Sequence, residues 1–154
     1  MAASFESSTT IHCSPDAVFA LATDFQRVSE WMPGVTQLEP LDEGPVRKGW
    51  RFKETRSMKG RQVSAVIEVI EHHGPAEGAP PYKHAARSSV MGVEGVYTFS
   101  FAALDGDKTA VQLRAEVRAT SFLAKPLVGL AAKAMKKQDG DMLAKLKALC
   151  EAEC

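Results

Sequence analysis

Hydrophobic and polar residues alternate with a period of two along much of the second half of the chain. The clearest case is TAVQLRAEVRAT, residues 109–120, in which Val111, Leu113 and the apolar residues after them are separated by polar or charged ones. Successive side chains of a strand point to opposite faces, so this segment predicts a strand with one buried and one solvated face. Similar alternation predicts further strands at residues 50–58, 61–73, 82–90 and 96–104.

Short turns separate these predicted strands. Lys59-Gly60 suits a two-residue hairpin turn, and MGVEG (91–95) and DGDK (105–108) are also turn sequences. Strands joined by so few residues pair in the antiparallel direction. Two more strands are expected outside this run, at residues 4–12 and at residues 35–41 before the loop DEGPVRKG.

Helical signals occupy the remaining segments. In SPDAVFALATD, Ser14 is a good N-cap, Pro15 fits the first helical position and Asp16 places a negative charge in the first turn. A second short helix is expected in DFQRVSEWMPG, which Pro33 and Gly34 end. The sequence therefore places two short helices between its first two strands.

A long helix is expected at the end of the chain. Apolar residues recur at helical spacing from about Phe122 to Glu153. Gly140, in KQDGDM, weakens this helix by about 1 kcal/mol relative to alanine, and a bend is expected there.

The order of these elements predicts an α+β fold in a single domain over residues 1–154. A curved antiparallel sheet must cover its apolar face, and the long C-terminal helix can do so. A sheet wrapped around a helix leaves space that side chains need not fill, and this space is a natural place for a pocket.

Several residues in the first half of the chain form a pattern that resembles one found in a known superfamily. The first strand runs into Ser-Pro-Asp-x-Val-Phe at residues 14–19, Asp24 and Trp31 follow, and Gly49 precedes Trp50 at the third strand. With the strand meander and the last helix, this pattern resembles the helix-grip superfamily of the birch pollen allergen, START domains and, most of all, bacterial polyketide cyclase/dehydrase and lipid-transport proteins. The resemblance implies a seven-stranded sheet and a largely apolar cavity for a small hydrophobic or amphipathic ligand. It implies no single reaction, because members bind, carry, cyclise or regulate.

The charge composition narrows the range of partners. The chain of 154 residues has 25% charged and 45% hydrophobic residues, as globular proteins do. Lys+Arg and Asp+Glu both number 19, so no net field draws the protein to nucleic acid or to an acidic membrane. Lys133, Lys136 and Lys137 form a local basic patch, which we interpret as a solvated helix face. No apolar run approaches the ~20 residues of a membrane span, so stable membrane insertion is not expected.

The cysteines indicate a reducing compartment. Cys13, Cys150 and Cys154 are odd in number and scattered, which does not predict a disulfide framework. The first residues lack the basic and apolar regions of a signal peptide, so the cytoplasm is the expected location. Cys150 and Cys154 share a helix face, but no further ligand of suitable spacing lies near them, and no metal site is expected there.

Three of the four histidines lie within IEHHGPAEGAPPYKH, residues 70–84. His72 and His73 are adjacent and point to opposite faces of a strand unless a bulge bends it, so we interpret them as the exposed end of a hairpin rather than a metal site. His84 shares a face with Tyr82. If that face is inward, His84 is a polar group in the pocket that can accept or donate a proton near neutral pH.

Glu54 and Arg56 share the strand phase of Trp50 and Phe52. If this phase points inward, the strand carries charge into the cavity, where each charge needs a partner or a ligand. Glu54 would then pair with Arg56 or Arg87, or bind a polar group of the ligand. If the strand instead extends beyond the core, both side chains are solvated. A bulge exchanges the inward and outward positions of every residue after it. Which side chains of the strands at residues 50–58 and 82–90 face the cavity therefore stays open.

The resemblance and the strand phases together define a set of candidate ligand-binding residues. The strands are expected to supply the walls, and the start of the last helix is expected to lie at the cavity mouth together with the turn at Met91. The candidates are Trp50, Phe52, Ile67, Tyr82, His84, Tyr97, Phe99, Leu113, Phe122, Leu123, Leu127 and Ala131.

Three functions fit these expectations. The first is binding of a small hydrophobic ligand, such as a lipid, a polyketide-like aromatic or an isoprenoid, driven by apolar burial at ~25 cal/mol per Å². The second is an enzyme of the cyclase or dehydratase kind, with His84, Tyr82 or Glu54 as the candidate acid or base. The third is a protein-interaction module, which a large exposed apolar patch would favour. No cofactor and no metal are expected, and a homodimer is one of the oligomeric states that the sequence leaves open.

Overall fold

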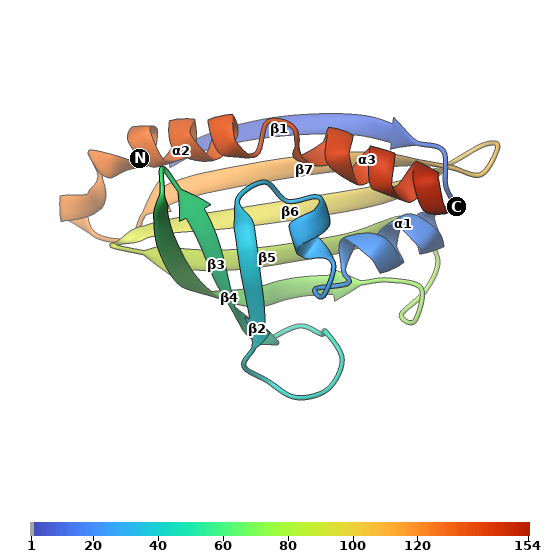
Figure 1. Ribbon diagram of the computed structural model, residues 1–154, viewed down its shortest axis with the longest axis horizontal. Coiled ribbons are helices and arrows are strands. Elements are labelled where there is room, and N and C mark those ends of the chain that lie inside the picture. Colours follow the sequence, from blue (N-terminus) through green and yellow to red (C-terminus); the bar gives the residue numbers. More distant parts are fainter. Residues whose placement is uncertain (1) are drawn as a thin grey trace.

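The structure, a computed structural model, describes residues 2–154. Within these residues the elements follow one another along the chain (Figure 1) as β1 (Ala2–Ile11), α1 (Pro15–Ala22), the 3₁₀ helix η1 (Val28–Glu30), β2 (Val35–Pro40), β3 (Arg51–Met58), β4 (Arg61–His73), β5 (Tyr82–Val90), β6 (Val93–Leu104), β7 (Lys108–Ala119), the 3₁₀ helix η2 (Phe122–Ala124), α2 (Leu127–Gln138) and α3 (Met142–Glu153).

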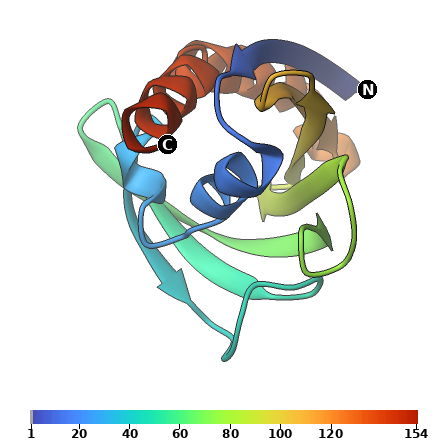
Figure 2. The same ribbon diagram turned by 90° about the vertical axis from the view of Figure 1, so that its right-hand side faces the viewer.

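The strands form one seven-stranded antiparallel sheet in the order β1-β7-β6-β5-β4-β3-β2. Each strand from β2 to β7 pairs with the next along the chain, and β1 returns to pair with β7. Seen from one end, the sheet curls around α1 (Figure 2), and α2 and α3 lie along β1 and β7 (Figure 1). The expected α+β helix-grip architecture is confirmed.

Helix α1 forms where its capping signals predict. Ser14 Oγ accepts a hydrogen bond from the backbone N–H of Ala17 at 3.2 Å, and Pro15 takes the first helical position. The apolar face of α1 buries Phe19, whose ring packs edge-on against Phe101 with 5.5 Å between the ring centroids. Side chains of β6, β7 and α3 complete this core, so one end of the curled sheet is filled by packing around α1.

Two hairpin turns show how few residues the meander needs. Lys59 and Gly60 have φ values of 51° and 78°, and Met91 and Gly92 have φ values of 52° and 77°. Positive φ at both central residues is typical of the type I′ turn, whose twist matches that of the flanking strands. The turn at Lys59-Gly60 is therefore confirmed. The predicted turn MGVEG is shorter than expected, because two residues suffice and β6 begins at Val93.

The C-terminal helix consists of two segments. The break between α2 and α3 lies at residues 139–141 and includes Gly140, where a bend was expected. Asp139 caps the end of α2, with its backbone N–H donating to the carbonyl of Met135. Its side chain is turned into the protein, and the residue as a whole is only 3% exposed.

Cys13 and Cys154 form a disulfide bond. The cysteine pattern predicted no disulfide, and this prediction was wrong. The two residues are separated by 141 positions, which leaves no local signal in the sequence. The fold brings the last turn of α3 beside the start of α1 (Figure 1), where the pair meets. Cys150 remains a free, buried thiol.

Among residues 2–154, no helix is both long and apolar enough to cross a bilayer. The same residues contain no group of three or more His, Cys, Asp or Glu side chains placed to hold a metal ion.

Candidate ligand-binding cavity

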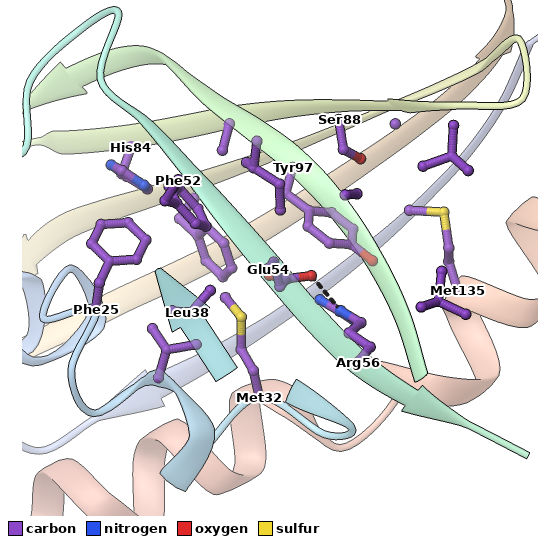
Figure 3. A pocket seen from close by; sticks show the side chains of 18 of the residues that line it. Phe25, Met32, Leu38, Phe52, Glu54, Arg56, His84, Ser88, Tyr97 and Met135 are labelled. Carbon is purple, nitrogen blue, oxygen red and sulfur yellow. Dashed lines mark hydrogen bonds and ion pairs between the residues drawn. The ribbon is translucent and has the colours of Figure 1, made fainter. Parts of the chain in front are cut away.

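A cavity of about 210 Å³ lies between the inner face of the sheet, the segment from α1 to β2, and α2 (Figure 3). One buried water needs roughly 10–15 Å³ by the same measure, so there is room for a small molecule. The wall is mostly apolar, and its large contributors include Phe25, Met32, Leu38, Phe52, Phe99 and Met135.

Strands β3 and β5 turn alternate side chains into this cavity. On β3 these include Glu54 and Arg56, and on β5 they include His84 and Ser88. The strand phase that the sequence left open is therefore the one that carries polar groups inward. Arg87 lies in the opposite phase of β5 and pairs with Glu68 on the outer face.

A charged cluster forms one side of the cavity, where Glu54, Arg56 and Tyr97 border it (Figure 3). Asp139, a buried residue outside the cavity lining, completes the cluster. Arg56 Nε donates to Glu54 Oε1 at 2.6 Å, and Arg56 Nη1 donates to Asp139 Oδ1 at 3.0 Å. The hydroxyl of Tyr97 donates to the second carboxylate oxygen of Asp139. Contacts to two carboxylates hold the guanidinium in one orientation against the cavity wall.

The cluster contains one positive and two negative side chains. Burial by itself lowers the pKa of Arg56, but the charges of Glu54 and Asp139 outweigh it and raise that pKa above its usual range. Burial, followed by the charge of Asp139, raises the pKa of Tyr97, so the phenol keeps its proton and acts as a donor. The cluster therefore carries a net negative charge and offers the cavity both an acceptor, on Glu54, and donors, on Arg56.

A β-bulge in β4 brings a second polar group to the inner face. Val69 pairs with Ala86 and Glu71 pairs with Ala85, so Ile70 is an extra residue on β4. The strand continues with the opposite phase after this point, which places the next residue, His72, on the inner face.

His72 lies directly opposite His84 in the β4–β5 register, and their Nδ1 atoms are 3.1 Å apart. The expectation that His72 and His73 form an exposed hairpin end was wrong, because both are half-buried. The bulge turns the ring of His72 against Phe19, with 5.2 Å between the ring centroids. His84 itself is 6% exposed and borders the cavity.

Burial, and then the neighbouring His72, lower the pKa of His84 to about 3. Burial also lowers the pKa of His72. Both rings are therefore neutral at pH 7, and one Nδ1 donates to the other. Because His84 uses Nδ1 for this contact, Nε2 is the nitrogen available to a molecule in the cavity.

We expect the protein to lose stability as the pH falls below about 6.5, because the unfolded chain then protonates His84 while the folded protein resists protonation down to about 3. The free energy of unfolding should drop by about 1.4 kcal/mol per pH unit for this one group. Urea unfolding at several pH values gives the free energy of unfolding as a function of pH. This free energy should fall less steeply with falling pH in His84→Phe than in the wild type. Val111→Ala, a core substitution, should lower stability equally at every pH. Equal slopes in the wild type and His84→Phe would contradict the buried neutral histidine.

Five of the candidate ligand-binding residues border the cavity, and these are Phe52, Ile67, His84, Tyr97 and Phe99. Three others lie in packed regions instead. Trp50 packs against Phe52 and Phe25, and Leu113 is fully buried in the main core. The hydroxyl of Tyr82 donates to Asp16 at 2.5 Å, and this hydrogen bond raises the pKa of Tyr82 to about 12.

The candidates from the last helix do not border the cavity. Phe122 and Leu123 point outward and are 79% and 87% exposed, and Leu127 is partly exposed beside them. Ala131 is half-buried on α2. The residue of α2 that does border the cavity is Met135, one turn further along the helix.

The sequence missed the contributions that come from outside the strands. Phe25 and Met32 reach the cavity from the connection after α1, and Asp139 completes the charged cluster from the end of α2. A signal for Asp139 was present, since it lies four residues after Met135 and so continues the inward side of the helix. An acidic residue at an inward helical position predicts a buried partner.

A family model described as "Polyketide cyclase / dehydrase and lipid transport" matches residues 2–151. No curated protein matches the chain.

Many solved structures share the fold. The Zhui aromatase/cyclase from Streptomyces sp. R1128 superposes with a TM-score of 0.76 at 16% identity, covering 98% of this chain and 94% of that one. Ara h 8.0201 gives a TM-score of 0.74 at 14% identity, with 99% and 100% covered. A START superfamily protein from Mycobacterium smegmatis gives 0.72 at 15% identity, with 98% and 99% covered. These likenesses concern the fold.

Proposed function

Because the chain belongs to the polyketide cyclase/dehydrase and lipid transport family, we propose that it binds a small hydrophobic or amphipathic molecule in its cavity. The ligand classes are a lipid, a polyketide-like aromatic or an isoprenoid. The observation that supports this most directly is the cavity of about 210 Å³, with its apolar wall and a few polar side chains. A pocket of this kind gains affinity from apolar burial and orientation from the polar groups.

The charged cluster sets which polar group the ligand presents. A hydroxyl could donate to Glu54 and accept from Arg56, and a carbonyl could accept from Arg56. A carboxylate would meet a cluster that already carries a net negative charge, so it is disfavoured. We therefore propose a ligand with an apolar body beside Phe25 and Phe52 and a neutral oxygen function at the Glu54–Arg56 pair.

Filling the cavity should weaken this binding without unfolding the protein. In Ala65→Leu the larger side chain occupies ligand space, because Ala65 borders the cavity. We expect the dissociation constant of the neutral fluorescent probe N-phenyl-1-naphthylamine to rise by on the order of tenfold or more, as for loss of about 1.4 kcal/mol. Fluorescence titration measures it.

The matched control is Ala110→Leu, since Ala110 lies on the outer phase of β7 between the buried Thr109 and Val111. It should bind the probe as the wild type does. Native mass spectrometry of protein purified from its own host, followed by denaturing extraction, should identify the natural ligand. Equal probe binding in Ala65→Leu and the wild type would contradict binding in the cavity.

A second candidate function is catalysis of the cyclase or dehydratase kind, and His84 is the observation that favours it. A neutral imidazole in an apolar cavity, with Nδ1 held by His72 and Nε2 available, is arranged to move a proton. Tyr82 and Glu54 are less suited, since Asp16 and Arg56 respectively occupy them. A polyketide-like substrate recovered unchanged after incubation supports the carrier, whereas a dehydrated or ring-closed product that His84→Phe no longer forms supports the enzyme.

We propose the cytoplasm as the compartment, and free thiols at Cys13 and Cys154 in protein taken from the cell would support this. A disulfide between them is typical of an oxidising compartment.

A further inference from the structure

Large apolar side chains are exposed together at one end of the molecule. Met91, Phe122, Leu123 and Leu130 are 83%, 79%, 87% and 68% exposed. They come from the β5–β6 turn, from η2 and from α2, which lie at the same end in Figure 1. The turn lies against the segment that contains η2, since the backbone N–H of Thr120 donates to the carbonyl of Gly92 at 2.7 Å and a Cβ on Gly92 would come within 3.1 Å of Ala124. We call these four residues the apolar tip.

Four lysines lie in the segment that carries three of the four tip residues. Residues 120–138 contain Lys125, Lys133, Lys136 and Lys137 and no aspartate or glutamate, although the whole chain balances 19 basic with 19 acidic residues. Lys125 Nζ lies 5.0 Å from the centre of the Phe122 ring. The other three lysines are exposed on α2. Although the whole chain has a net charge of zero, residues 120–138 carry only positive charges. The same segment contains Phe122, Leu123 and Leu130 of the apolar tip.

We propose that the apolar tip and its lysines dock the protein on the surface of an anionic lipid bilayer. Apolar side chains at the end of a molecule can enter the boundary between headgroups and acyl chains, while lysines extend to the anionic headgroups. The two contributions act together, because weak apolar insertion and electrostatic attraction are each marginal alone.

A second copy of the chain fits this surface less well. A two-fold symmetric contact would place the apolar tip against its own equivalent and bring eight lysines together, four from each chain. No acidic residue of the segment 120–138 could compensate them. An anionic bilayer supplies both the apolar environment and the opposite charge.

The docking surface adjoins the rim of the cavity. Val90 borders the cavity and directly precedes Met91, and Met135 borders it from the inner side of α2. Docking would therefore place the cavity rim beside the bilayer. Exchange of a ligand with the membrane rests on the proposed function, but the docking itself does not.

Co-sedimentation of the full-length protein with vesicles tests the proposal. The protein should bind vesicles of equal parts phosphatidylcholine and phosphatidylglycerol, bind phosphatidylcholine alone much more weakly, and detach as salt is raised. Lys133→Gln/Lys137→Gln should weaken binding by about twenty-five-fold, at roughly fivefold per lysine. Phe122→Ser/Leu123→Ser should weaken it by about tenfold or more.

Matched controls separate docking from general effects. Val66→Ser removes an apolar side chain that is 53% exposed on β4, and Lys48→Gln removes an exposed lysine of the β2–β3 loop. Both should bind vesicles as the wild type does, and all variants should bind N-phenyl-1-naphthylamine normally. Loss of probe binding with intact docking would overturn only the proposed function.

The proposal is overturned if the wild type does not bind anionic vesicles, or if the tip variants bind as well as the wild type. It is also overturned if analytical ultracentrifugation shows a wild-type dimer that Phe122→Ser/Leu123→Ser converts to a monomer. The apolar tip would then be an interface between two copies of the chain.

Discussion

Arg56→Met should destabilise the protein by about 3–5 kcal/mol, the cost of leaving buried charges without their partner. Arg56 is the cation shared by Glu54 and Asp139, and the side chain of Asp139 is fully buried. The methionine would fill similar space but donate no hydrogen bond to either carboxylate. Part of the loss should be recovered at low pH, where the carboxylates protonate. Urea unfolding at neutral and acidic pH measures both effects.

Two comparisons make this result specific to the cluster. Arg87→Met breaks an exposed ion pair with Glu68 on the outer face, and it should cost less than about 1 kcal/mol. Combining Arg56→Met with Glu54→Gln and Asp139→Asn removes the uncompensated charges, and it should restore part of the stability that Arg56→Met loses. A loss from Arg56→Met as small as that from Arg87→Met would show that the cluster is solvated.

Cys154→Ser should also lower the free energy of unfolding, by about 2–5 kcal/mol. The Cys13–Cys154 bond closes a loop of nearly the whole chain, which restricts the unfolded state strongly. In the folded state it holds the end of α3 beside α1, where Arg27 and Glu153 also pair. Urea unfolding with and without a phosphine reductant measures the effect.

The reductant provides the internal control for this result. With the disulfide reduced, the wild type and Cys154→Ser should unfold at nearly the same urea concentration. Cys150→Ala should respond to the reductant as the wild type does, because Cys150 is a free thiol. If the wild type and Cys154→Ser unfold together without reductant, the two cysteines are not joined in the purified protein.

The parts of the fold that follow local rules could be predicted. The strict alternation of Val111, Leu113 and Val117 is found again as the buried face of β7, and Ser14 caps α1 as its residue type indicates. The start of β6 could not be placed, because Val93 and Glu94 follow a turn glycine and lack a strand signal of their own. Gly95 lies within β6, where a Cβ would come within 3.3 Å of Met135.

The site was harder to predict because it depends on contacts between distant segments. The alternation in β3 alone predicts that Glu54 and Arg56 lie on the same face of the strand. Their third partner, Asp139, lies 83 residues after Arg56. The disulfide partner of Cys13 is equally remote. Leu113 was assigned to the right face, yet being inward does not decide whether a side chain meets the cavity or the packed core.

The bulge in β4 has a consequence for how this chain can change in length during evolution. Removing the codon for Ile70 would return β4 to regular alternation while Ile67, Val69 and His72 keep their inward positions. Removing a codon elsewhere in the same strand, such as that for Val66, would exchange inner and outer side chains along the residues before it or after it. An in-frame deletion at the bulge, of Ile70 or of its neighbour Glu71, therefore preserves the inner surface, and an alignment gap in relatives is to be expected there.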